Sequence, residues 1–165
     1  MIPLRAVIES MGMSIDFCTS RQAIIINQSG GSIQMITEDW REFERRVLEL
    51  TNIERANHGL QPVVWQDNLA AAARAHSTDM AVRGFAGHIC PDGGTPGMRA
   101  REHGFSQAVT ENIAWGQTTP EQVVEWWMNS PGHRANILTP THRHLGVGVF
   151  SISGFYMFLW TQKFN

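Results

Sequence analysis

The sequence carries little charge, and neither sign is in excess. Lysine and arginine number 13 and aspartate and glutamate 15 among 165 residues, a formal net charge of −2 at pH 7. Proteins that bind nucleic acids or anionic membranes concentrate positive charge to neutralise phosphates. The composition therefore argues against a nucleic-acid partner. A chain of this length suits one domain with one hydrophobic core, with room for a short appendage.

Long hydrophobic runs are also absent. No window approaches the roughly 18 uninterrupted apolar residues of a membrane-spanning helix, so we expect no transmembrane segment. The N-terminal stretch does not read as a signal peptide, because Glu9 and Asp16 fall where an unbroken apolar region should lie. If the protein is exported, we expect its signal peptide upstream of Met1.

Cysteines are scarce, and the common local catalytic motifs are missing. Cys18 and Cys90 are too few for a disulfide-rich scaffold, and the sequence leaves open whether they pair. The chain has no GxSxG, HExxH, Walker or CxxC motif, so it predicts no nucleophile elbow, helix-borne zinc pair or phosphate cradle. Six tryptophans and seven histidines are many beside so few charges, and such rings are common in ligand sites.

Residues 1–36 differ from the rest in their pattern of apolar runs and turn residues, and they are predicted to form a separate unit. A short helix is predicted over residues 4–11. Two apolar runs, residues 23–26 and 33–36, flank a turn and predict a β-hairpin. The segment resembles the end of the small repeat domain named after the copper amine oxidase N-terminus. It is too short to bury a core, so we expect it either to pack on the rest of the chain or to pair with a second copy in a homodimer.

Residues 37–165 begin with two helices whose ends carry clear signals. The first starts at a Thr37 cap and ends near Gly59. Its apolar stripe is Phe43, Val47, Leu50 and Ile53. The second runs from Asp67 to about residue 83 and closes on Gly84. The alanines of this second helix imply close packing against its neighbours.

The second half of the chain predicts a loop, a helix and a strand pair. Residues 86–118 hold six glycines and two prolines, which predicts a long loop with one helical turn at 98–103. Thr119 begins a capping box with proline at the first helical position, and that helix ends at 130–132. A short turn over 133–138 follows. The strands predicted next, 145–151 and 155–162, form a central antiparallel pair, and the whole is a layered α+β domain.

A few polar residues stand among apolar or glycine-rich neighbours and are candidates for chemistry. They are His76, His88, Glu111, Glu125 and His133. Two imidazoles and a carboxylate that converge would suit a zinc ion or an acid–base pair. These residues are widely separated, so their spacing alone does not show whether they converge.

Some of the rings and the second cysteine also have a structural interpretation. His76 lies on the apolar stripe of its helix, which favours a core histidine bonded to backbone. His142 and His144 share one face near a strand start and are interpreted as solvent-exposed. Cys90, two residues after His88, is interpreted as a buried, inert thiol.

Four sequence blocks, in order, carry a resemblance to a known family. They are HSTDMAVRGFAGH (76–88), TENIAWG (110–116), VVEWWMNSPGHRANIL (123–138) and HLGVGVF (144–150). Residues 40–165 resemble the CAP superfamily in its bacterial form, named after cysteine-rich secretory proteins, antigen five and pathogenesis-related proteins. The resemblance implies a three-layer α–β–α sandwich with a central antiparallel sheet and a wide cleft, and it places the domain at residues 37–165.

The resemblance also implies a cleft with two histidines and two acidic residues. It places the histidines at His88 and His133 and the first acid at Glu111. The second acid falls at or near Ser130, where this sequence has no carboxylate. Glu125, one helical turn earlier, is the only nearby replacement.

Family members use the two histidines to hold a divalent ion, commonly zinc, and the resemblance therefore implies a weak Zn²⁺ site here. Its ligands would be His88 and His133, with water in the open positions. Trp115 is expected to line the cleft, whereas Trp126 and Trp127 are interpreted as core residues.

Two functions remain open at this point. The first is a non-catalytic module at a bacterial surface or in the secreted fraction that binds a cell-wall, lipid or peptide ligand in its cleft. The alternative is a zinc-dependent hydrolase of peptide or peptidoglycan, with Glu111 as the catalytic base. The missing second acid favours the binding module.

Overall fold

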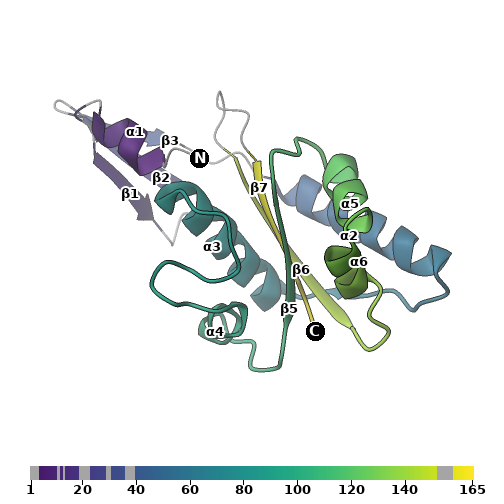
Figure 1. Ribbon diagram of the computed structural model, residues 1–165. Coiled ribbons are helices and arrows are strands. Elements are labelled where there is room, and N and C mark those ends of the chain that lie inside the picture. The colour runs from purple at the N-terminus through teal and green to yellow at the C-terminus, as the bar shows by residue number, and fades with distance from the viewer. Residues whose placement is uncertain are drawn as a thin grey trace.

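The fold is a three-layer α–β–α sandwich, which confirms the predicted class. The computed structural model describes residues 4–10, 12, 14–18, 23–28, 31–35, 40–151 and 158–165. A four-stranded sheet forms the middle layer, with α3 and α4 on one side and α2, α5 and α6 on the other (Figure 1). The sandwich is built from α2 (Arg41–Asn57), β4 (Val64–Trp65), α3 (Asp67–Arg83), α4 (Pro96–Glu102), β5 (Thr110–Trp115), α5 (Pro120–Met128), α6 (Pro131–Ile137), β6 (His144–Ser151) and β7 (Phe158–Phe164).

The sheet has the strand order β4-β6-β7-β5, so β6 and β7 are central. Both the β6–β7 and the β7–β5 pairs are antiparallel, and this confirms the predicted central antiparallel pair. The two-residue strand β4 adds a short parallel pairing at one edge. Strand β7 continues to Phe164, past the predicted end, while the predicted start at Phe155 lies outside the described residues.

Helix α3 lies unusually close to β6 because two glycines of the strand face it. A Cβ at Gly146 would stand 2.2 Å from the backbone nitrogen of Ala70, and one at Gly148 would stand 2.1 Å from that of Arg74. The two contacts are four residues apart on the helix and two apart on the strand, and these spacings span similar distances, roughly 6 to 7 Å. The close packing that the alanines of α3 imply is therefore confirmed. The helix also ends as predicted, with Gly84 at φ +68°.

The main core lies between the sheet and the α2–α5 layer. Trp127 and Trp160 are its largest fully buried rings. Val47 of α2 is buried there as predicted, but Ile53 is 51% exposed, so its place in the predicted stripe is wrong. The predicted Thr37 cap lies outside the described residues, and α2 is described from Arg41.

Two segments differ from their predicted structure. The long loop contains a regular strand, β5, because pairing with β7 overrides a local sequence of low strand propensity. The predicted turn over 133–138 is helix α6, which begins at Pro131. The predicted helical turn at 98–103 corresponds to α4, which starts two residues earlier at Pro96 with Thr95 as its cap.

The N-terminal segment forms a sheet separate from the sandwich. It contains α1 (Leu4–Ser10), β1 (Ser14–Cys18), β2 (Ala23–Gln28) and β3 (Gly31–Met35), with antiparallel order β1-β2-β3. The helix and the hairpin were predicted, whereas β1 was not. Helix α1 packs on β1 and also contacts α3. The predicted boundary after residue 36 falls among residues that are not described.

Candidate functional site

The centre of the candidate site is a hydrogen bond between His88 and Glu111. Glu111 projects from β5 and is buried, while His88 lies in the loop between α3 and α4 with a side chain that is 46% exposed. The His88 Nδ1 atom is 2.9 Å from the Glu111 Oε1 atom. An ionised carboxylate only accepts hydrogen bonds, so Nδ1 is the donor, and in the neutral form of the ring the lone pair is on Nε2.

Glu111 is neutralised from the protein side by two buried cations. The Arg99 guanidinium donates to both carboxylate oxygens, at 3.1 and 3.0 Å. Lys163 of β7, directly opposite Glu111 in the strand register, donates to Oε2. The Nε2 atom of His76 lies 3.7 Å from Oε1. The carboxylate is therefore held in one position by several charged donors.

These contacts fix the protonation of the buried groups. Burial acts to raise the pKa of Glu111, but the hydrogen bond from His88 and the charges of Lys163, His76 and Arg99 outweigh it and lower the pKa to about 2. Burial lowers the pKa of Lys163, and the Glu111 charge opposes that change. Burial also lowers the pKa of His76 to about 4. Glu111 is therefore ionised at neutral pH and a weak base.

Arg99 also anchors the loop that carries His88. Its guanidinium donates to the backbone carbonyls of His88 and Gly94, both at 2.9 Å, and to the Cys90 sulfur at 3.1 Å. The sequence reasoning missed both Arg99 and Lys163. The only signal for Lys163 was a lone charge in a strand whose other residues are mostly apolar or uncharged.

His133 lies on α6, in the layer on the opposite side of the sheet from the α3–α4 layer. It is the third residue of α6, and its ring centroid lies 5.0 Å from that of Trp126. Burial lowers the pKa of His133, and repulsion from His88, when that ring is protonated, lowers it further, which favours the neutral imidazole. Its Nδ1 atom is buried and has no hydrogen-bond partner among the described residues.

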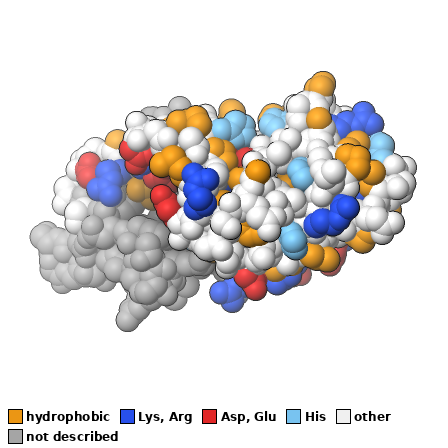
Figure 2. Space-filling view, turned by 90° about the horizontal axis from the view of Figure 1, so that it is seen from below, with side chains coloured by type: hydrophobic (Ala, Val, Ile, Leu, Met, Phe, Trp, Pro, Cys, Tyr) orange, Lys and Arg blue, Asp and Glu red, His pale blue; other side chains and the backbone are white. Residues whose placement is uncertain are grey.

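Two exposed tryptophans come from the elements that carry the site. Trp115 ends β5 and is 48% exposed, and Trp126 of α5 is 40% exposed. The interpretation of Trp126 as a core residue is wrong, because its ring packs on His133, whereas Trp127 is fully buried as predicted. In Figure 2, several histidine side chains lie at the surface beside hydrophobic ones on the face seen from below.

Neither Ser130 nor Glu125 provides a second carboxylate that contacts the His88–Glu111 pair. Ser130 is the N-cap of α6, and its side chain makes no capping hydrogen bond. Glu125 is exposed on α5, and its side chain makes no hydrogen bond or ion pair with the other residues that the structure describes. Among the described residues, Glu111 is therefore the one carboxylate that contacts His88.

The remaining candidates are structural. His76 is fully buried and donates from Nε2 to the Gly87 carbonyl at 3.0 Å, which confirms the core interpretation. Cys90 is buried, as predicted, and burial raises the pKa of its thiol. The exposed interpretation of His142 is wrong, because its ring stacks on Phe164 at 5.1 Å. His144 is half-buried and lies 3.3 Å from the Asn165 side-chain oxygen.

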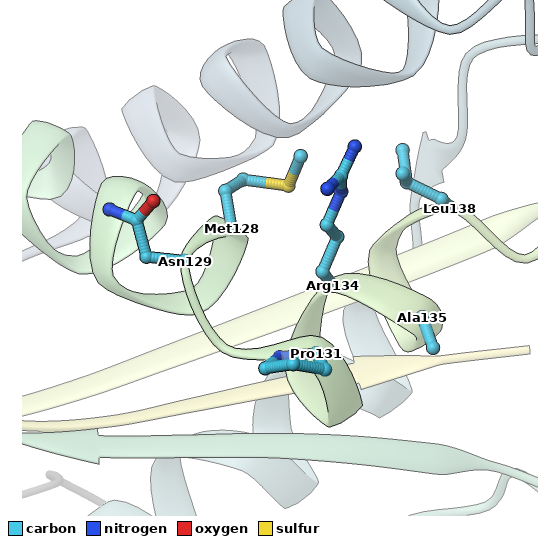
Figure 3. Close-up of a pocket in the computed structure, with 6 residues that line it drawn as sticks. All are labelled: Met128, Asn129, Pro131, Arg134, Ala135 and Leu138. Atoms are coloured by element: carbon cyan, nitrogen blue, oxygen red, sulfur yellow. The ribbon is translucent and has the colours of Figure 1, made fainter.

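A separate cavity of about 390 Å³ opens beside α5 and α6. It is lined by Met128, Asn129, Pro131, Arg134, Ala135 and Leu138 (Figure 3). The Arg134 guanidinium lies between Met128 and Leu138 and donates to the His58 Nε2 atom at 3.0 Å. This cavity shares no residue with the His88–Glu111 pair.

Sequence comparison finds relatives over most of the sandwich. The profile of the Cysteine-rich secretory protein family, CAP, matches residues 48–164. The chain is 44% identical over 123 residues to the uncharacterized protein YkwD of Bacillus subtilis, which is 74% of this chain and 46% of that protein. It is 37% identical over 117 residues to the uncharacterized membrane protein YlbC of the same species, covering 68% of this chain and 34% of that protein. The chain thus spans less than half the length of both relatives.

Solved structures share the same fold. An outer surface protein of Borrelia burgdorferi superposes with a TM-score of 0.72 at 19% identity, over 78% of this chain and 95% of that one. An extracellular protein containing an SCP domain from Bacillus anthracis superposes with a TM-score of 0.71 at 24% identity, over 92% of this chain and 59% of that one. Among the described residues, no helix is both long and apolar enough to cross a membrane.

Proposed function

The chain belongs to the cysteine-rich secretory protein (CAP) family, and from that premise we propose that it is a non-catalytic binding module that works outside a bacterial cell. Its site would hold a divalent metal ion, Zn²⁺ in the first place, between His88 and His133. A cell-wall, lipid or peptide ligand would bind over the ion and the exposed Trp115 and Trp126. The names of the two solved relatives, an outer surface protein and an extracellular protein, support this location.

One observation carries the proposal: the buried Glu111 carboxylate accepts a hydrogen bond from His88 and thereby orients its ring. A carboxylate that accepts a hydrogen bond from one ring nitrogen orients the imidazole and directs the other nitrogen outward. In the neutral ring, the Nε2 atom of His88 would carry the free lone pair, and the side chain is 46% exposed, so a metal ion could reach it. His133 is neutral for a separate reason, since burial and His88 lower its pKa.

The donor types of His88 and His133, two imidazoles, suit a weak Zn²⁺ site. No group of three or more His, Cys, Asp or Glu side chains lies together among the described residues in a way that could hold an ion. Two imidazoles would therefore be the protein ligands, and water or a bound ligand would complete the coordination. A bound zinc ion would act as a Lewis acid toward an oxygen or nitrogen of the ligand.

The hydrolase alternative is weaker for the same reason. A catalytic base needs a pKa near the working pH, whereas the hydrogen bond from His88 and the surrounding cations hold the pKa of Glu111 at about 2 despite its burial. Turnover of peptidoglycan or a peptide that stops when a chelator is added would restore the hydrolase and overturn the binding module.

Calorimetric titration with Zn²⁺ tests the metal site. We expect uptake by the wild type that weakens as the pH falls and the imidazoles become protonated, because an imidazole must be neutral to bind. The His88→Ala/His133→Ala double variant should lose this uptake. A matched control replaces the exposed His58, which is not a proposed ligand, with glutamine and should keep it. Equal uptake by wild type and double variant contradicts the proposed site.

A further inference from the structure

Asn112 follows Glu111 on β5 and points to the opposite face of the sheet, because successive strand residues alternate. Glu111 contacts His88 on the α3–α4 side. The Asn112 side chain is fully buried and contacts α6, the helix that carries His133. Two adjacent residues of one strand thus connect to the two histidines from opposite layers.

The Asn112 amide attaches α6 at two points one helical turn apart. Its Nδ2 atom donates to the His133 carbonyl at 3.1 Å, and its Oδ1 atom accepts from the Asn136 Nδ2 atom at 2.8 Å. Asn136 also donates to the Glu111 carbonyl at 3.3 Å. Two attachment points on one short helix fix both its height above the sheet and its rotation.

The amide is itself held by a buried polar chain. The Asn112 Nδ2 atom also donates to the Gln162 Oε1 atom at 3.1 Å, and the Gln162 Nε2 atom donates to the Thr51 hydroxyl at 2.8 Å. All three side chains are fully buried. Both amide hydrogens of Asn112 are used, and aspartate, which has the same shape, provides neither.

We propose that Asn112 is a positioning residue that sets the place of the His133 ring relative to His88, through the backbone carbonyl of His133 and through Asn136. The inference deepens the metal site and rests on the proposed function for its consequence, the metal affinity. The position of the His133 ring itself does not depend on a metal. Residues that orient metal ligands typically contribute roughly tenfold to a hundredfold in affinity.

The test compares three variants of the full chain. Asn112→Asp removes both donors and keeps the acceptor, and Asn112→Ser is a smaller variant that admits water if the aspartate variant does not fold. Thr51→Val breaks the far end of the same chain without touching α6 and is the matched control. Each folded variant is titrated with Zn²⁺, and the His133 ring-proton shifts are measured by NMR without metal, where the Trp126 ring at 5.0 Å displaces them.

We expect the Asn112 variants to bind Zn²⁺ at least roughly tenfold more weakly and to shift the His133 ring protons, with Thr51→Val within about twofold of wild type and its ring protons unmoved. Unchanged His133 shifts in both Asn112 variants overturn the inference. An equal effect of Thr51→Val on both readouts also overturns it, because the effect would then come from general loosening. If the wild type takes up no Zn²⁺, the metal part of the proposed function fails, and the ring-proton shifts still decide the role of Asn112.

Discussion

Glu111 illustrates how neighbours decide what a residue does. The same carboxylate in a polar, half-exposed place would be an ordinary acid–base group. Here Arg99 and Lys163 approach it from the protein side and His88 from the solvent side. With those partners it orients an imidazole and holds a loop to a strand, and it has little basicity left for catalysis.

Replacing Glu111 with glutamine should destabilise the fold strongly. The variant leaves Arg99 and Lys163 buried without their anion, and removing one partner of a buried pair costs about 3–5 kcal/mol. We expect the free energy of unfolding at pH 7, measured by urea denaturation, to fall by that amount. Glu121→Gln is the control, since Glu121 pairs with Arg46 at the surface, where such pairs contribute no more than about 1 kcal/mol. Equal losses of unfolding free energy in the two variants would show that the buried Glu111 cluster contributes no more to stability than a surface ion pair.

His76 should make the protein sensitive to mild acid. Burial lowers its pKa from 6.5 to about 4, so below pH 6.5 the unfolded chain binds a proton that the folded chain does not. The contribution of the neutral His76 to the free energy of unfolding is therefore fully present above pH 6.5. It is lost as the pH falls toward 4, by about 3 kcal/mol. Thermal unfolding of His76→Gln should show a flatter pH dependence over this range, while the exposed His58→Gln keeps the wild-type slope. A wild-type slope in His76→Gln would show that other groups cause the acid sensitivity.

At the level of the element, β6 and α3 define how the sandwich closes on the α3–α4 side. Gly146 and Gly148 allow the helix backbone to contact the strand backbone, with no side chain between them. Close contact at this point sets the position of α3, and with it His76 and the start of the loop that carries His88. The α3–β6 contact therefore affects the site from a distance.

A methyl group at Gly148 should disrupt this contact. The added Cβ would meet backbone atoms of Ala73 and Arg74 at 2.4 Å or less, and backbone cannot rotate away as a side chain can. Overpacked cores lose about 1–3 kcal/mol or more, so we expect a large fall in melting temperature or loss of folding for Gly148→Ala. Gly132→Ala is the control, because a Cβ there meets nothing within 4 Å. A melting temperature close to wild type in Gly148→Ala would contradict this account of the packing.

The sequence predicted helices better than it predicted β5. Helix α3 has local signals at both ends, a periodic apolar face and the left-handed Gly84 that closes it, and these signals act within a few residues. Strand β5 has no such signal, because Glu111 and Asn112 belong to residue types that are depleted in strands. Their partners, Lys163 and Gln162, lie 52 and 50 residues away on β7. Only the folded sheet brings these polar residues into register and satisfies them.

The same limit applied to the candidate site. The family blocks located His88, Glu111 and His133, but they gave no sign of Arg99, Lys163 or the attachment of α6 through Asn112. Those contacts depend on which side of a strand each residue occupies. A periodicity of two, once β5 is known to be a strand, separates Glu111 from Asn112 and predicts that they serve opposite layers.

For the whole molecule, the sandwich brings two distant layers together at the edge strand β5. His88 comes from the α3–α4 layer and His133 from the α5–α6 layer. The outward carbonyls of the edge strand are not left open, since Trp127 donates to that of Ile113 and Asn136 to that of Glu111. The edge is thus covered by the helices that build the site, and this protects it from pairing with another chain.

Deleting residues 1–36 should leave a folded domain. The superposition with the Borrelia protein covers 78% of this chain and 95% of that one. That protein therefore consists almost entirely of the shared fold, which supports folding of the sandwich without the N-terminal segment. We expect the shortened chain to unfold cooperatively, to keep its Zn²⁺ uptake and to run as a monomer in light scattering, with the full chain running as a dimer through the N-terminal sheet. A monomeric full chain would rule out the dimer. Failure of residues 37–165 to fold would show that the segment, through the contact of α1 with α3, belongs to the core.

Anomalous X-ray diffraction from Zn²⁺-soaked crystals would show directly whether His88 and His133 of two layers share one metal site at β5. We expect a single strong anomalous peak about 2.0–2.1 Å from the Nε2 atom of His88 and from a ring nitrogen of His133. The His88 Nδ1 atom should remain bonded to Glu111. A peak bound elsewhere with none at this position, or imidazole rings of His88 and His133 too far apart to share an ion, would contradict the account.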